Sequence, residues 1–131
     1  MRKLWIPIAA FLGLTSVGLA AYASHGLGFV SDPVVREATR STLQMAVQQQ
    51  MFHALALLGV GILALQAPSN RWLCAAGGLL VLGVLLFSGL IYLRIFTGVE
   101  SLRALVPWGG TSLMLGWLAL GVGGFKAARS A

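Results

Sequence analysis

Four long apolar runs divide this chain and decide what it can fold into. They cover residues 4–23, 43–65, 72–95 and 107–125 of a 131-residue sequence. Each has about the 20 residues that a helix needs to cross a hydrocarbon core of about 30 Å. Within lipid, a helix satisfies the backbone hydrogen bonds of its own segment. We therefore expect an all-α fold, an integral membrane four-helix bundle that forms one transmembrane domain over residues 1–131.

Charged residues are too few to cover a water-facing surface. They make up 9% of the chain, against about 25% in a soluble domain. The net charge is +6, but the basic residues lie singly or in pairs at the ends of the apolar runs, unlike the basic face of a nucleic-acid binder. We therefore expect membrane lipids as partners, and no nucleic acid. The single Cys74 excludes an internal disulfide, and no CxxC or Cys/His cluster indicates zinc.

The first run has features of a cleavable signal peptide. A basic start precedes it, and Ala21-Tyr22-Ala23 matches the A-x-A cleavage pattern. The run is longer than a signal core of roughly 7 to 15 residues, so we expect a retained helix.

Lysines and arginines near the run ends predict the orientation. Five lie on the side of the termini and four on the other side, which favours an inner-membrane protein with both termini in the cytoplasm. The five are Arg2, Lys3, Arg71, Lys126 and Arg129, and the four are Arg36, Arg40, Arg94 and Arg103. We also expect aromatic belts, with Trp5 and Trp72 at the inner boundary and Tyr22, Tyr92 and Trp108 at the outer one.

The second run has a helix start well before it. Asp32 is a good N-cap, and Pro33 then falls at the first helical position, where its missing N–H costs nothing. We predict an amphipathic surface helix that leads into the second span, about 50 Å long up to Leu65. It must protrude, tilt or bend near Ser41-Thr42. The spacing would also pair Asp32 with Arg36 and Glu37 with Arg40.

Small residues offer close helix contacts, which matter because lipid removes the hydrophobic drive between spans. The fourth run carries a stripe of them at steps of four and three. Internal packing and a contact with another subunit both fit this stripe. Near it, Trp117 lies in the middle of its run, either as structural filling or stacked on a ligand. The packing residues are Ser112, Gly116, Ala119 and Gly123, with Gly83 in the third run.

Chemistry-bearing side chains gather toward the outer half of the bundle. The apolar runs contain no Asp or Glu, which argues against a proton-driven transporter. Ionisable or amide side chains are candidates for a site that binds a small molecule. They are His25, Gln49, Gln50, His53, Tyr92 and Arg94.

Three interpretations of this group stay open. His53 and the glutamines can bond across helices and fix their register. His25 and His53 can ligate a metal or haem, although they supply only two ligands, without an HxxxH or CxxC pattern. The group can also bind a quinone, a lipid headgroup or another small molecule, with Arg94 as the partner of an anion or carbonyl.

Four segments resemble one known family in the right order and spacing. Residues 20–27 (AAYASHGL) resemble its GAFGAHGL signature, and residues 47–58 (VQQQMFHALALL) resemble VQYQMYHALALL. Residues 86–93 (LFSGLIYL) resemble LFSGSLYLL, and residues 106–110 (VPWGG) resemble TPIGG. The four patterns are those of the domain-of-unknown-function family 423, which consists of small bacterial membrane proteins similar to the eukaryotic transmembrane protein 256.

The resemblance implies a four-helix membrane protein without an assigned activity. Ala20 and Ala23 stand where the family has Gly, and Tyr22 where it has Phe, which puts close backbone packing there in doubt. The family positions map onto His25, Gly26, Gln50, His53, Ser88, Gly89, Tyr92, Pro107 and Gly110, and we assign Ser88 and Gly89 to helix packing.

Two functions follow as hypotheses. The first is a non-enzymatic accessory or scaffold subunit, or a homo-oligomer, with other membrane subunits or further copies as partners. The second is a carrier or binder of a small hydrophobic ligand or lipid headgroup near the outer leaflet. We expect no catalytic residue, no metal and no cofactor.

Overall fold

The computed structural model describes residues 2–130, which contain helices and no strand. Met1 and Ala131, which the predicted domain includes, and the side chain of Arg2, which the orientation argument uses, lie outside the described part. A π-helical turn (Leu85–Gly89) joins α3 to α4, and short 3-10 turns lie at Arg2–Leu4, Leu27–Phe29 and Arg103–Leu105. The α-helices are α1 (Trp5–His25), α2 (Pro33–Gln66), α3 (Arg71–Val84), α4 (Leu90–Thr97) and α5 (Val106–Ser130).

Four helical stretches are long and apolar enough to cross a membrane. They are Trp5–Phe29, Pro33–Gln66, Arg71–Thr97 and Arg103–Arg129. The prediction of an all-α protein with four membrane-crossing helices is therefore confirmed.

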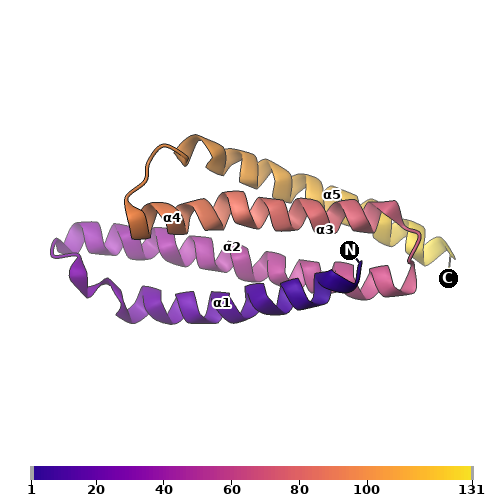
Figure 1. The fold of residues 1–131 in the computed structure, drawn as a ribbon, viewed down its shortest axis with the longest axis horizontal. Coiled ribbons are helices and arrows are strands. Elements are labelled where there is room, and N and C mark those ends of the chain that lie inside the picture. The colour runs from indigo at the N-terminus through magenta and orange to yellow at the C-terminus, as the bar shows by residue number, and fades with distance from the viewer. Residues whose placement is uncertain (1, 131) are drawn as a thin grey trace.

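The four stretches lie in an antiparallel row. The helix α1 packs on α2, α2 on α3, and α3 on α5, so that α1 and α5 form opposite edges (Figure 1). Both ends of the chain lie at the same end of the bundle as the α2–α3 turn (Figure 1). The connections before α2 and after α4 lie at the other end.

The start of α2 follows the capping signal. Asp32 Oδ1 accepts hydrogen bonds from the backbone N–H of Val34 at 2.8 Å and of Val35 at 3.3 Å. The 34-residue helix continues through Ser41-Thr42 without a break. At 1.5 Å per residue it is about 50 Å long, more than a hydrocarbon core, so it must protrude or tilt.

One of the two predicted ion pairs on α2 forms. It joins Arg40 Nη1 to Glu37 Oε2 at 2.7 Å. The predicted pair of Asp32 with Arg36 is wrong, because Arg36 Nε donates instead to the backbone oxygen of Val30 at 2.7 Å. The Asp32 carboxylate already caps the helix.

Trp5 does not belong to an aromatic belt. Only 5% of its surface is exposed, and its ring fills the space over Gly77, where an added Cβ would lie 2.5 Å from a ring atom. By contrast, Trp72 and Trp108 are exposed. The expected belt position of Trp5 is wrong, because a small residue on α3 opens a slot for the ring inside the bundle.

The contact between α3 and α5 is built from glycines facing leucines. Gly83 faces Leu113, Gly116 faces Leu80, and Gly123 faces Leu73; a Cβ on any of them would come within 2.9 Å of its leucine. Ser112 and Ala119 are also buried. Gly89 has only the Val84 carbonyl within reach of a Cβ, at 3.9 Å. Close contact between helices therefore involves only some of the residues that were predicted for helix packing.

The tightest backbone approach occurs at Gly109, which sequence analysis missed. A Cβ there would lie 2.5 Å from the backbone nitrogen of Phe87, whereas at Gly110 the nearest atom would be a Phe87 ring carbon at 3.9 Å. The start of α5 thus rests directly on the π turn.

This difference predicts opposite effects of two neighbouring substitutions. Gly109→Ala should lower the free energy of unfolding by about 1 to 3 kcal/mol, because the backbone of the π turn must move. Gly110→Ala should be neutral or stabilising, since alanine favours a helix by about 1 kcal/mol over glycine. Thermal unfolding in mild detergent, followed by circular dichroism, measures both. Equal stability of the two variants would contradict the close approach.

Candidate functional site

Gln50 ties α1 to α2 in the interior. Its side chain is 3% exposed, and Nε2 donates to the backbone oxygen of Leu12 at 2.9 Å and to Thr15 Oγ1 at 2.7 Å. The amide N–H groups of this predicted ligand-binding residue are therefore used between helices.

Two serines tie the remaining helices together. Ser88 Oγ in the π turn donates to the backbone oxygen of Ala46 on α2 at 2.7 Å. Ser112 Oγ on α5 donates to the backbone oxygen of Leu79 on α3 at 2.8 Å. Such bonds between spans compete with no water. With Gln50 they fix the register of all the long helices.

His53 presents an unused nitrogen close to the middle of α2. The side chain is 6% exposed, and Nδ1 lies 2.6 Å from the backbone oxygen of Gln49. Because a carbonyl oxygen only accepts, the neutral ring carries its proton on Nδ1, and Nε2 is an acceptor. In the part of the chain that the structure describes, the hydrogen bond at Nδ1 is the only one that the ring makes, so Nε2 has no partner there. The ring meets Trp117 edge-on, with centroids 6.1 Å apart.

These two rings border an open groove of about 370 Å³ between α2, the π turn and α5. We call it the α2–α5 groove. Its walls are mostly apolar, with His53, Gln49 and Thr111 as the polar members. It is lined by Gln49, His53, Phe87, Pro107, Gly110, Thr111, Leu113, Met114 and Trp117.

The π turn shapes one wall of the groove. It places Phe87 against the groove, while the next residue, Ser88, bonds to α2. Single π turns inside α-helices are rare and often occur at functional sites. Apolar spacing alone gave no signal for it, since the run from 72 to 95 reads as one uninterrupted helix. The VPWGG segment that resembles the family pattern contributes Pro107 and Gly110.

His25 does not join His53. It is exposed at the end of α1, where Arg40 Nε reaches the neighbouring Ala23 carbonyl at 3.2 Å. Arg40 and His53 are 13 residues apart on α2, which is about 20 Å along a helix. The described residues also contain no group of three or more His, Cys, Asp or Glu that could hold a metal. A shared site of the two histidines is therefore excluded by geometry.

Arg94 and Tyr92 also lie away from the groove. Arg94 Nε is 3.7 Å from Glu100 Oε1, and the residue lines a separate cavity of about 260 Å³ against the first turns of α2. Tyr92 packs with Tyr22 against Leu43 and Val47. Its hydroxyl is buried without a hydrogen-bond partner among the described residues. Of the six predicted binding residues, only Gln49 and His53 line the groove.

Comparisons with known proteins agree with this architecture. A family model described as "Protein of unknown function (DUF423)" matches residues 19–110. A UPF0382 membrane protein of Staphylococcus haemolyticus is 38% identical over 126 residues, covering 95% of this chain and 97% of the relative. UPF0382 membrane proteins of Haemophilus influenzae and Bacillus subtilis are 31% and 33% identical, covering 97% and 95% of this chain and 98% of each relative. No solved structure matches.

The interior bond of Gln50 generates a testable difference between two glutamines. Gln50→Leu should lower the free energy of unfolding by about 0.6 to 1.7 kcal/mol, which are the average and the largest values for side-chain hydrogen bonds between membrane helices. Gln48→Leu, at an exposed position of the same helix, should have no such effect. Unfolding in mild detergent measures both, and an unchanged Gln50→Leu protein would rule out the tie.

Proposed function

We propose that this chain, which belongs to the DUF423 family and whose relatives are called membrane proteins, binds a lipophilic small molecule in the α2–α5 groove without transforming it. The observation that carries the proposal is the unused Nε2 of His53, an acceptor at membrane depth beside an apolar groove. Ionisable groups at such depth are functional candidates by default. We further propose that the protein resides in a bacterial inner membrane, with both termini on the cytoplasmic side.

The lining of the groove indicates the chemistry of the ligand. Phe87, Met114 and Trp117 offer apolar and aromatic surface. Thr111 Oγ1 already donates to the backbone oxygen of Pro107 at 3.1 Å, so its oxygen, like His53 Nε2, is left as an acceptor. These two acceptors suit a ligand with a hydroxyl group on a ring or an isoprenoid chain, and the Gln49 amide adds both a donor and an acceptor at the edge of the groove. The volume of about 370 Å³ is at the small end of ligand sites.

A binding role fits this groove better than turnover. His53 is the one ionisable side chain among the described residues that line it. Acid–base or nucleophilic catalysis normally places a second group within hydrogen-bond reach of such a histidine. Here Nδ1 is held by the Gln49 carbonyl, which orients the ring and leaves it as an acceptor.

The proposal requires that the ligand donate a hydrogen bond to His53 Nε2. A short-chain alkyl hydroquinone and its dimethyl ether, which lacks the hydroxyl hydrogens, test this requirement. The protein in nanodiscs should bind the hydroquinone more tightly than the ether. His53→Leu should weaken hydroquinone binding by about tenfold, the effect of one lost hydrogen bond. His53→Gln, which keeps an acceptor, should bind better than the leucine variant. Calorimetric titration measures all the affinities.

His25→Leu is the matched control, because it removes the other histidine, which lies at the end of α1 and does not line the groove. It should leave the affinity unchanged. Equal binding of the hydroquinone by the wild type and by His53→Leu would overturn the proposal, as would an equal affinity for the ether. A wild-type protein that binds neither compound would also overturn it.

A second candidate function is that of an accessory or scaffold subunit, or a homo-oligomer. It is supported by the edge position of α1, which packs mainly on α2 and exposes Phe11, Leu14 and Val17. In the same helix, a Cβ added to Gly13 or to Gly18 would have no other atom within 4 Å. A neighbouring helix would therefore find room for close backbone contact here.

The subunit hypothesis predicts that a bulky substitution on the exposed face of α1 lowers the mass of the complex in detergent. The wild-type protein in mild detergent should migrate as a dimer or larger complex in size exclusion with light scattering. Gly13→Trp should shift it to the monomer, whereas Gly121→Trp, at an open position on α5, should not. A wild type that is monomeric at all concentrations and co-purifies with no other subunit would exclude this role.

A further inference from the structure

Basic residues among the described part of the chain gather at the end of the bundle that carries both termini, where α3 begins and α5 ends. The three acidic residues of the chain, Asp32, Glu37 and Glu100, all lie at or near the opposite end. Lys126 and Arg129 occupy the last turns of α5, three residues apart, so that they are neighbours on the helix surface.

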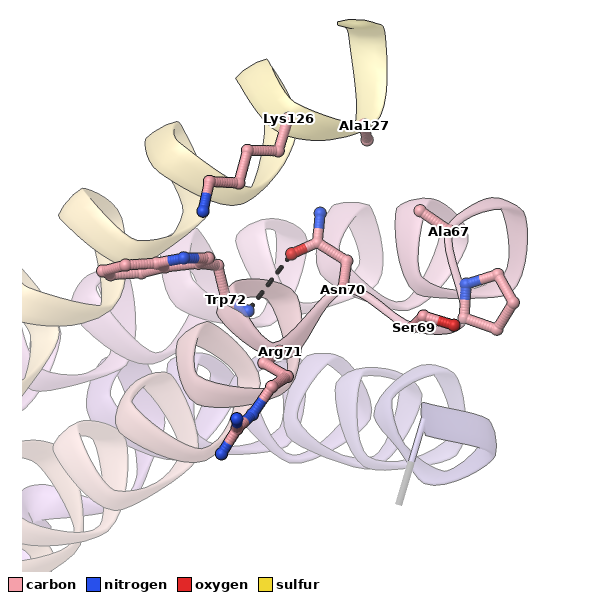
Figure 2. A pocket seen from close by; sticks show the side chains of 8 residues that line it. Ala67, Ser69, Asn70, Arg71, Trp72, Lys126 and Ala127 are labelled. Atoms are coloured by element: carbon pink, nitrogen blue, oxygen red, sulfur yellow. Dashed lines mark hydrogen bonds between the residues drawn. The ribbon is translucent and has the colours of Figure 1, made fainter. Parts of the chain in front are cut away.

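Both cations are held against aromatic rings. Lys126 Nζ lies 5.3 Å from the centre of the Trp72 ring. Arg129 Cζ lies 5.6 Å from the centre of the Phe125 ring. Figure 2 shows the Lys126 side chain reaching from α5 toward the face of Trp72 at the start of α3. The rings thus fix two positive groups at the end of a membrane-crossing helix.

An open cleft of about 430 Å³ lies on the α3 side of Lys126. Asn70 forms part of its wall, because Oδ1 accepts from the backbone N–H of Trp72 at 3.1 Å (Figure 2). Its Nδ2 donates to the Gly123 carbonyl of α5 at 2.8 Å. The Arg71 side chain points away from Lys126 (Figure 2). Arg71 and Lys126 both line this cleft, and Lys126 is the one that reaches it from α5.

A second hollow, of about 560 Å³, adjoins Lys126 along α5. Gly121, Val122 and Phe125 form its apolar part, and Lys126 and Arg129 close it toward the end of the helix. Gly121 leaves it open, since no atom lies within 4 Å of a Cβ built there. An apolar trough that ends at two cations, beside a polar cleft, has the amphipathic profile of a phospholipid.

We propose that this end of α5 is a binding site for an anionic phospholipid. The phosphate lies between Lys126 and Arg129, one acyl chain follows the trough at Gly121 and Val122, and the headgroup enters the cleft beside Asn70. Charge complementarity favours an anionic over a zwitterionic lipid. The apolar trough distinguishes the lipid from free phosphate, which would gain nothing from it. This site is independent of the α2–α5 groove.

Native mass spectrometry of the full chain in detergent tests the proposal with phosphatidylglycerol and phosphatidylcholine. The wild type should retain phosphatidylglycerol, and K126Q/R129Q should retain about tenfold less. K126R/R129K, which keeps both charges, should retain it like the wild type. The matched control is R36Q/R103Q, which removes two positive charges near the opposite end and should not change retention. Melting temperatures show that each variant is folded.

Three results would overturn the proposal. The first is equal retention of phosphatidylglycerol by the wild type and by a folded K126Q/R129Q protein. The second is equal retention of phosphatidylcholine and phosphatidylglycerol by the wild type. The third is displacement of the lipid by millimolar glycerol 3-phosphate, which would make the site one for a soluble phosphate.

Discussion

The scarcity of hydrogen-bond partners in hydrocarbon is the constraint on which this bundle depends. A buried side-chain donor must find its acceptor within the protein, either in its own helix, as Ser16 does with the Leu12 carbonyl, or on a neighbouring helix. Gln50, Ser88 and Ser112 each donate to a backbone carbonyl of another helix. Since lipid contributes no hydrophobic drive between spans, these bonds and the glycine–leucine contacts of α3 and α5 hold the helices in register.

The sequence was sufficient where the signal is local. Hydropathy defines four spans because a lipid-crossing segment must be apolar over its whole length, and Asp32 with Pro33 marks the start of α2 because a cap needs only neighbouring residues. Trp5 was misplaced because its position depends on a slot at Gly77, 72 residues further along the chain. Arg36 was mispaired because the preceding loop folds its Val30 carbonyl toward the guanidinium.

The candidate site was only partly predictable for the same reason. His53 and Gln49 stood out because polar groups are rare inside apolar runs. Their actual neighbours, Phe87, Pro107 and Trp117, come from other helices and depend on the π turn, which apolar spacing does not reveal. His25 and Arg94 were grouped with them by approximate depth, yet they lie near the end of the bundle where Arg40 meets Ala23. Depth along a span is a weaker guide than helix register.

The row arrangement has a consequence for how the protein is made. Every large interface joins helices that follow one another along the chain, from α1 with α2 to the α3–α4 stretch with α5. Such local connectivity makes for a low contact order, which favours rapid folding. Each span can therefore dock on its predecessor as soon as it leaves the translocation machinery. No early helix has to wait, unpartnered, for one synthesised much later.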